Sequence, residues 1–289
     1  MWIVFACGSA LFAGITAVLA KEGIRTTDST VATALRTVVV LAGAWGMVLI
    51  VGSQAELAHL DARSTGLLVL SGLATGASWL CYFKALQLGN VSKVVPIDKL
   101  STVLTVLLAL IFLGERVNLI GALGVALIAV GTLLMLDADD LRGLPRAVRD
   151  GGGWLLYALG SAFFAALTAI LGKAGITGVE SNLGTAIRTG VVLVMAWVMV
   201  AVTGRLHEVR TVPKGELGFV LASGAATCAS WLCYYRALQD GPASVVVPID
   251  KLSVLVTVLF SALVLREAVN RRYLVGLALL VGGTLAMVL

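Results

Sequence analysis

The sequence predicts an all-α integral membrane protein with ten transmembrane helices, arranged as two inverted five-helix repeats. Three observations carry this prediction. The 289 residues are 59% hydrophobic and only 13% charged, whereas a soluble domain has about 25% charged residues. Ten apolar runs, each about as long as a membrane span, follow one another along the chain. The sequence also matches itself without a gap when it is shifted by 152 residues.

The internal match indicates a duplication. Between residues 71–102 and 223–254, 23 of 32 positions are identical. We therefore expect a first five-helix repeat at residues 1–136 and a second at residues 154–289. Residues 137–153 form a charged, glycine-rich linker between them.

The apolar runs set the expected helices. They lie roughly at 2–20, 31–51, 65–86, 92–113 and 119–136, and then at 154–172, 183–203, 216–238, 244–265 and 273–289. Helices are expected because the strands of membrane barrels alternate apolar and polar residues, and these runs do not. Because five is an odd number, the second copy enters the membrane from the opposite side. Inverted repeats of this kind are typical of secondary transporters, whose site lies near the midplane between the repeats.

Basic residues predict the orientation. Thirteen Lys and Arg residues have no basic counterpart in the other half. Two of them, Arg63 and Arg116, lie in connections on one side. The other eleven share the opposite side: Arg25, Lys93, Arg142, Arg146, Arg149, Arg205, Arg210, Lys214, Arg266, Arg271 and Arg272. The positive-inside rule places the eleven in the cytoplasm. We therefore expect a multi-pass protein of the bacterial inner membrane with periplasmic termini.

Several other functions are disfavoured by the composition. The net charge of +5 follows the membrane topology and forms no basic face for nucleic acid. The four cysteines lie in apolar runs without a Cys-x-x-Cys motif, and the two histidines lie in polar connections, so we expect no metal and no cofactor. The sequence has no nucleophile–base signature and no phosphate-binding glycine loop, and an enzyme is not expected. The expected partners are the lipid bilayer and a small-molecule substrate.

Polar and aromatic residues repeat along one face of the third run in each half. They are Ser71, Thr75, Ser78 and Tyr82, then Ser223, Thr227, Ser230 and Tyr234, with Trp79 and Trp231 alongside. The first runs carry a weaker stripe at Ser9, Thr16, Ser161 and Thr168. These residues could line a substrate path. The hydroxyls could equally hydrogen-bond across helix interfaces, and the aromatic residues could anchor at the membrane surface. Glycines in the fifth runs are expected at close helix contacts: Gly121, Gly124, Gly131, Gly276, Gly282 and Gly283.

Each half contains the octapeptide VVPIDKLS, at 94–101 and at 246–253. Proline removes a backbone donor and often kinks a helix. The charged pairs Asp98–Lys99 and Asp250–Lys251 follow two residues later, and Ser101 and Ser253 end the motifs. Charges at membrane depth are costly and usually face a partner or a wet cavity. The motifs are therefore candidates for substrate binding or gating.

The connectivity suggests partners for these charges. We expect Asp98 to pair with Arg36 and Asp250 with Arg188, because a bidentate Arg–carboxylate contact tolerates burial best. Each pair would hold one mouth of the protein closed and separate when that mouth opens. The lysines would then reach the substrate. Alternatively, the acids cap helix starts near the interface and the basic side chains extend to water.

The segments YFKALQLGNVSKVVPIDKLSTVLTVLLALIFLGE and YYRALQDGPASVVVPIDKLSVLVTVLFSALVLRE, each followed by a glycine-rich run, carry a resemblance. With the ten runs, they resemble the EamA family of the drug/metabolite transporter superfamily. Pro96 and Glu115, with Pro248 and Glu267 in the second copy, fit the family pattern. The Asp-Lys pair resembles a subset whose members are often single five-helix copies. The resemblance implies alternating access around a central cavity, and export or exchange of metabolites, amino acids or drug-like compounds. Ten-helix members usually have cytoplasmic termini, whereas the charges of this chain predict the opposite.

Two functions from different mechanisms remain open. The first is a secondary transporter for a small zwitterionic or anionic, amino-acid-like metabolite. It is favoured because the connectivity gathers a charged cluster of four bases and one acid near each mouth. The first cluster is Lys21, Arg36, Lys84, Asp98 and Lys99, and the second is Lys173, Arg188, Arg236, Asp250 and Lys251. The alternative is a proton-coupled exporter of apolar cationic, drug-like compounds in which Asp98 and Asp250 exchange protons. A scaffold is disfavoured by the inverted repeat. Since the linker supplies both halves in one chain, a monomer with an internal pseudo-dimer is expected to suffice.

Overall fold

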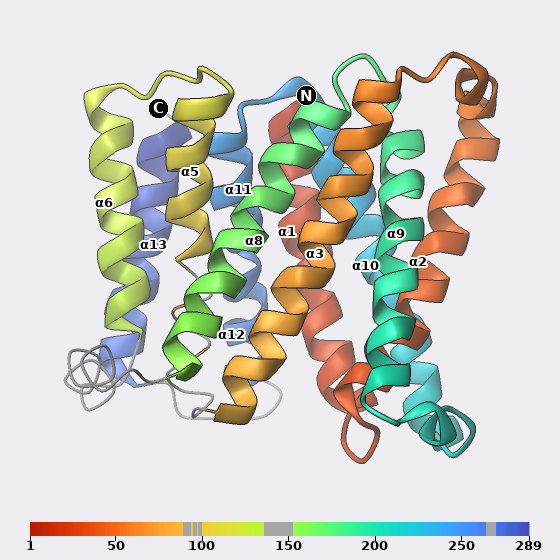
Figure 1. The fold of residues 1–289 in the computed structure, drawn as a ribbon. Coiled ribbons are helices and arrows are strands. Elements are labelled where there is room, and N and C mark those ends of the chain that lie inside the picture. The colour runs from red at the N-terminus through yellow and green to blue at the C-terminus, as the bar shows by residue number, and fades with distance from the viewer. Residues whose placement is uncertain (89–93, 95–96, 98–99, 136–152, 264–269, 289) are drawn as a thin grey trace.

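The computed structural model describes residues 1–88, 94, 97, 100–135, 153–263 and 270–288 (Figure 1). Its α-helices are α1 (Trp2–Gly23), α2 (Ser29–Val51), α3 (Ala62–Leu88), α5 (Ser101–Phe112), α6 (Leu119–Leu134), α8 (Gly153–Gly175), α9 (Ser181–Val202), α10 (Lys214–Asp240), α11 (Ala243–Lys251), α12 (Ser253–Leu263) and α13 (Arg271–Val288). Two short 3₁₀ helices lie at Ser53–His59 and Leu206–Arg210. The described part of the chain contains no strand, and seven of its helices are long and apolar enough to cross a membrane.

Carboxylates set the starts of α2 and α9. The side chain of Asp28 accepts hydrogen bonds from the backbone N–H groups of Thr30 and Val31, at 2.8 and 3.3 Å. Glu180 does the same for Asn182 and Leu183, at 3.0 Å each. Such caps satisfy donors that the first turn of a helix leaves free. Asp28 and Glu180 are equivalent residues of the duplication, so both copies start this helix in the same way.

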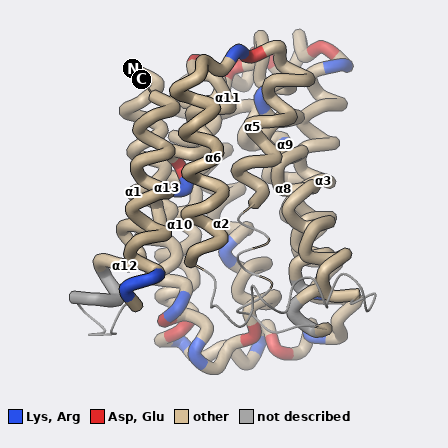
Figure 2. The backbone as a smooth tube through the Cα atoms, turned by 90° about the vertical axis from the view of Figure 1, so that its left-hand side faces the viewer, with Lys and Arg blue, Asp and Glu red and all other residues tan. Residues whose placement is uncertain are grey.

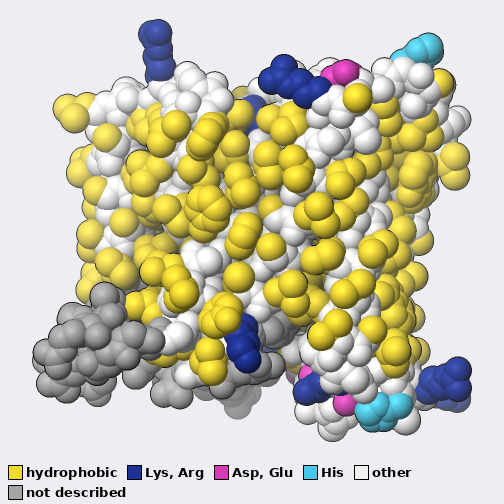
Figure 3. All heavy atoms as spheres, in the orientation of Figure 1, with side chains coloured by type: hydrophobic (Ala, Val, Ile, Leu, Met, Phe, Trp, Pro, Cys, Tyr) yellow, Lys and Arg dark blue, Asp and Glu magenta, His cyan; other side chains and the backbone are white. Residues whose placement is uncertain are grey.

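The helices lie side by side along a common direction, and the two chain ends lie at the same end of the bundle (Figures 1 and 2). Charged residues gather at the two ends, with few between them (Figure 2). On the face seen in Figure 3, hydrophobic side chains cover the zone between these ends. A bundle with an apolar belt and charged ends is what a lipid bilayer requires. The chain is a multi-pass membrane protein.

The two halves of the chain are interleaved. Helix α3 of the first half packs against α8 of the second, and α1 packs against α10 in the same way. Helices α2 and α9 contact each other, as do α6 and α13. Elements 152 residues apart therefore have equivalent neighbours, and every one of these contacts joins the two halves. Neither half buries its helix faces without the other.

The fourth run of the second half differs from the prediction. We expected one helix over 244–265, but the structure has two, α11 and α12, which meet at Leu252. Pro248 lies inside α11 and cannot donate a backbone hydrogen bond. The chain then tightens, because Leu252 N–H donates to the carbonyl of Ile249 and Leu255 N–H to that of Leu252, at 2.9 and 2.8 Å. In the first half, α5 begins at Ser101, and Pro96, Asp98 and Lys99 lie outside the described residues.

Candidate substrate site

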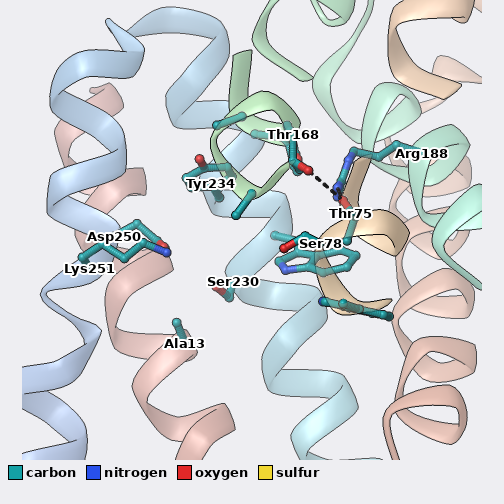
Figure 4. Close-up of a pocket in the computed structure, with 14 residues that line it drawn as sticks. Ala13, Thr75, Ser78, Thr168, Arg188, Ser230, Tyr234, Asp250 and Lys251 are labelled. Atoms are coloured by element: carbon teal, nitrogen blue, oxygen red, sulfur yellow. Dashed lines mark hydrogen bonds between the residues drawn. The ribbon is translucent and has the colours of Figure 1, made fainter. Parts of the chain in front are cut away.

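A cavity of about 240 Å³ lies between the two halves of the chain (Figure 4). Its walls come from α1, α3, α8, α9, α10 and α11. Thr75, at the midpoint of α3, lies in its lining, so the cavity is near the middle of the bundle. Asp250 and Lys251 reach it from the last turn of α11, directly before the break at Leu252. Sites of secondary transporters are commonly built at such interrupted helices.

Arg188 of α9 is the main positive charge of the cavity. Its side chain is only 1% exposed. Nη2 donates to Thr75 Oγ1 at 2.7 Å, and Nε donates to Ser71 Oγ at 3.4 Å. The guanidinium also lies over two aromatic rings, 5.0 Å from the centre of Trp231 and 4.6 Å from that of Tyr235. Nη1 has no hydrogen-bond partner within the described structure, and none of the ion pairs there involves Arg188.

A buried guanidinium with a free donor is well suited to an anion. Burying an unpaired charge is costly, so buried arginines are normally matched by a carboxylate. Here two neutral hydroxyls and two aromatic faces orient the guanidinium instead. They fix its position without neutralising its charge. The arrangement can therefore bind a carboxylate or another small anionic group that enters the cavity.

Asp250 and Lys251 lie on the other side of the cavity from Arg188 (Figure 4). Asp250 Oδ1 accepts a hydrogen bond from Ser9 Oγ of α1 at 2.5 Å. The ion pair that we expected between Asp250 and Arg188 when this mouth is closed is not among the ion pairs of the described residues. Asp250 contacts α1 through Ser9, while hydroxyls of α3 hold Arg188.

Serine and threonine hydroxyls join the helices around the cavity. Between α3 and α8, Ser71 Oγ donates to the carbonyl of Thr168 at 2.8 Å, and Ser78 Oγ donates to that of Ser161 at 3.0 Å. Between α10 and α1, Ser230 Oγ donates to the carbonyl of Ser9 at 3.1 Å. The two readings of the polar stripe are thus compatible, because Ser78 and Ser230 hold helices together and also line the cavity.

Comparison with known proteins agrees with this architecture. The model of the EamA-like transporter family matches residues 1–137 and again residues 152–289. The chain belongs to the EamA-like transporter family. This family is part of the drug/metabolite transporter superfamily, as the sequence motifs predicted.

Two bacterial relatives support the family membership. An uncharacterized transporter encoded in the cobO 3' region of Sinorhizobium sp. is 47% identical over 134 residues, which are 46% of this chain and 95% of the relative. The uncharacterized transporter YxxF of Bacillus subtilis (strain 168) is 26% identical over 159 residues, or 48% of this chain. This chain spans about half the length of YxxF, since the match covers 50% of it. A protein crystal structure shares the fold, with a TM-score of 0.72 and 19% identity over 97% of this chain and 94% of that one.

The EamA-like fold brings together part of the predicted site. Eight predicted residues line the cavity: Ser78, Trp79, Arg188, Ser230, Trp231, Tyr234, Asp250 and Lys251. Four others are not in its lining: Arg36, Tyr82, Ser101 and Ser253. Asp98 and Lys99 lie outside the described residues. No group of three His, Cys, Asp or Glu side chains that could hold a metal ion occurs in the described ranges.

Two bases of the second charged cluster have structural partners. Lys173 Nζ donates to the carbonyls of Leu238, at 2.7 Å, and of Gly241 at the end of α10. Arg236 Nε lies 3.2 Å from Asp240 Oδ2, one helical turn away and partly exposed. These contacts fix helix ends and leave Arg188 and Lys251 as the bases of this cluster that face the cavity.

Tyr235 is a lining residue that the sequence reasoning missed. It is 2% exposed and stacks edge-on against Tyr234, with ring centres 5.2 Å apart. Gly172 allows its position, because a Cβ there would lie 2.7 Å from the Tyr235 ring. One signal was available in the sequence. The equivalent residue of the first half is Phe83, so the hydroxyl breaks the repeat within its most similar stretch.

Proposed function

We propose that this EamA-like protein is a secondary transporter for a small zwitterionic or anionic, amino-acid-like metabolite. One observation carries the proposal. Arg188 is buried in the wall of a central cavity, and its Nη1 has no partner within the described structure. An anionic group of the substrate would supply the missing partner. The guanidinium carbon lies over the rings of Trp231 and Tyr235, and Nη1 is left for this contact.

The cavity wall opposite Arg188 carries an acid, Asp250, which favours a zwitterionic substrate. Asp250 could accept hydrogen bonds from a substrate ammonium group while Arg188 binds its carboxylate. Both charges of the ligand would then be matched across the cavity. The cavity, at about 240 Å³, is smaller than the roughly 300–1,000 Å³ of pockets for drug-sized ligands. Its size and the presence of Arg188 and Lys251 favour a small metabolite over an apolar cationic drug.

We further propose ten spans in two inverted repeats that give alternating access to one site. Equivalent helix contacts 152 residues apart support this architecture. So does the Sinorhizobium relative, because 46% of this chain covers almost all of it. Since every major contact joins the two halves, one chain contains both repeats that the mechanism needs. A monomer should transport, which reconstitution at one protein per vesicle would test. Transport that appears only with two chains per vesicle would contradict it.

The proposed orientation has both termini in the periplasm. Its support is the charge bias, with eleven unmatched bases on the linker side and two on the other. The chain ends lie together at one end of the bundle, as an even number of spans requires. A C-terminal alkaline phosphatase fusion should be active. An active cytoplasmic reporter at the same position would reverse the orientation.

The function can be tested with purified protein in detergent and in proteoliposomes. The probes are neutral amino acids, small carboxylates and a lipophilic cation. Zwitterions should raise the unfolding temperature of the wild type and exchange across the vesicle membrane. Arg188→Gln should weaken this binding at least about tenfold, because a buried charged hydrogen bond is lost. Arg236→Gln is the matched control, since it removes an exposed arginine outside the cavity.

The alternative makes the opposite prediction. A proton-coupled cation exporter should bind the lipophilic cation as well in Arg188→Gln as in the wild type, or better. Its transport should depend on a pH gradient and fail in Asp250→Asn. That result, together with zwitterion binding that ignores Arg188, would overturn the proposal.

A further inference from the structure

Arg36 of α2 is the repeat counterpart of Arg188, and its backbone is placed in the same way. A Cβ built on Gly72 of α3 would lie 2.9 Å from the Arg188 carbonyl oxygen. A Cβ built on Gly224 of α10 would lie 3.0 Å from the Arg36 carbonyl oxygen. The equivalent residues Gly72 and Gly224 therefore let α3 approach α9 and α10 approach α2 at nearly the same separation.

The side chains of these equivalent elements are arranged differently. On α3, Ser71 Oγ donates across to α8, and both Ser71 and Thr75 accept from Arg188. On α10, Ser223 Oγ donates to the carbonyl of Val220 in its own helix, at 2.7 Å. Neither Ser223 nor Thr227 receives a hydrogen bond from Arg36, which is not in the lining of the cavity. One sequence pattern thus exists in two hydrogen-bonded states within the same molecule.

We propose that Arg36, Ser223 and Thr227 form a second site for the anionic group of the substrate, used in the opposite conformation of the transporter. This inference rests on the proposed function. When the arrangements of the halves exchange, Arg36 would turn to Thr227 and Ser223 as Arg188 now turns to Thr75 and Ser71. At these two glycine contacts the exchange needs no new backbone contact, because the contacts are already equivalent.

The second site would present the same chemistry in a less polar setting. Its aromatic counterpart to Trp231 is Trp79, which already lies in the wall of the cavity. Its counterpart to Tyr235 is Phe83, which has no hydroxyl. The ligand class is therefore a small carboxylate or comparable anion, held first by Arg188 and then by Arg36 as access changes sides.

The test separates equilibrium binding from exchange. The matched variants are Thr75→Val and Thr227→Val, which remove one hydroxyl from equivalent positions of α3 and α10. Binding is measured with a zwitterionic amino acid in detergent, and exchange is measured as counterflow of the same compound in proteoliposomes. Thr75→Val should weaken binding about tenfold. Thr227→Val and Arg36→Gln should retain binding but slow counterflow about tenfold, because counterflow requires both conformations.

Each result has one meaning. If Thr227→Val and Arg36→Gln exchange as fast as the wild type, the second site does not exist. If Arg36→Gln weakens binding as much as Arg188→Gln, Arg36 supports the present site and the inference is wrong. Should Arg36→Gln fail to fold, the milder Thr227→Val decides. Failure of the proposed function looks different, because Thr75→Val and Arg188→Gln would then leave binding unchanged.

Discussion

Two regions of the bundle hold their helices together by different means. The edge pair, α6 and α13, is packed through glycines. A Cβ on Gly131 would lie 2.5 Å from the Gly276 carbonyl oxygen, and one on Gly283 would lie 2.5 Å from that of Gly124. The central helices α1, α3, α8 and α10 are joined by serine and threonine hydroxyls around a cavity. Four of the six glycines expected at close contacts thus touch the facing helix.

We infer from this difference that the edge pair serves mainly stability and the central helices serve mainly function. In a bilayer the packing of backbones and small residues supplies much of the association between helices. The backbones of the edge pair are in direct contact, so any separation of α6 from α13 would lose this packing. The centre keeps polar groups and empty volume, which can rearrange at lower cost. Changes at the edge should therefore reduce stability, whereas changes in the centre should reduce binding and exchange.

The largest expected effect comes from one methyl group at the edge. Gly283→Ala would place its Cβ against backbone atoms of α6, and overpacking of this kind costs about 1–3 kcal/mol. The neighbouring Gly282 is the control, since no atom lies within 4 Å of a Cβ there. Gly282→Ala should be neutral or slightly stabilising, because alanine favours helix more than glycine does. Thermal unfolding in detergent measures both. Equal effects of the two variants would show that the edge pair is not tightly packed.

An intermediate effect is expected at Lys173, in the last turn of the central helix α8. Lys173→Met keeps the aliphatic length but removes the donor to the carbonyls of Leu238 and Gly241. The loss should be about 1–2 kcal/mol of unfolding free energy, because the ammonium is partly solvated. Zwitterion affinity should be unchanged, since Lys173 is not in the cavity lining. Arg236→Met, at a partly exposed pair, should cost well below 1 kcal/mol. An affinity loss in Lys173→Met without a stability loss would assign this lysine to the substrate path.

Local sequence information was sufficient to predict an all-helical membrane protein. Apolar length predicts a span because the bilayer fixes how many residues are needed. The period of the helix placed Ser71, Thr75 and Ser78 on one face, and the structure uses that face toward α8 and the cavity. Family motifs gave the EamA-like membership, which the family model confirms.

Features that depend on tertiary arrangement were not predictable. The place of the break, at Leu252, depends on how the chain packs after Pro248. The pairing of Asp250 with Arg188 was based on how well a bidentate contact tolerates burial, whereas in this structure hydroxyls of α1 and α3 contact the two side chains. Tyr235 was not among the predicted site residues, because only the approach of Gly172 and Arg188 gives its ring a role. The repeat likewise does not predict that the two halves interleave, because it shows which segments are similar and not which segments are in contact.

The smallest expected effect tests whether the hydroxyl contacts of α3 and those of α10 differ. Ser71 bonds across to α8 and accepts from Arg188, whereas the equivalent Ser223 bonds only to Val220 of its own helix. Hydrogen bonds between membrane helices average about 0.6 kcal/mol, so Ser71→Ala should lower the unfolding temperature slightly. Ser223→Ala should leave it unchanged, because no contact between helices is lost. Zwitterion affinity should fall only in Ser71→Ala, where Arg188 loses an acceptor. If both variants shift stability and affinity equally, the hydroxyl contacts of α3 and α10 are equivalent in the protein. The proposed functional difference between Arg188 and Arg36 would then have no structural basis.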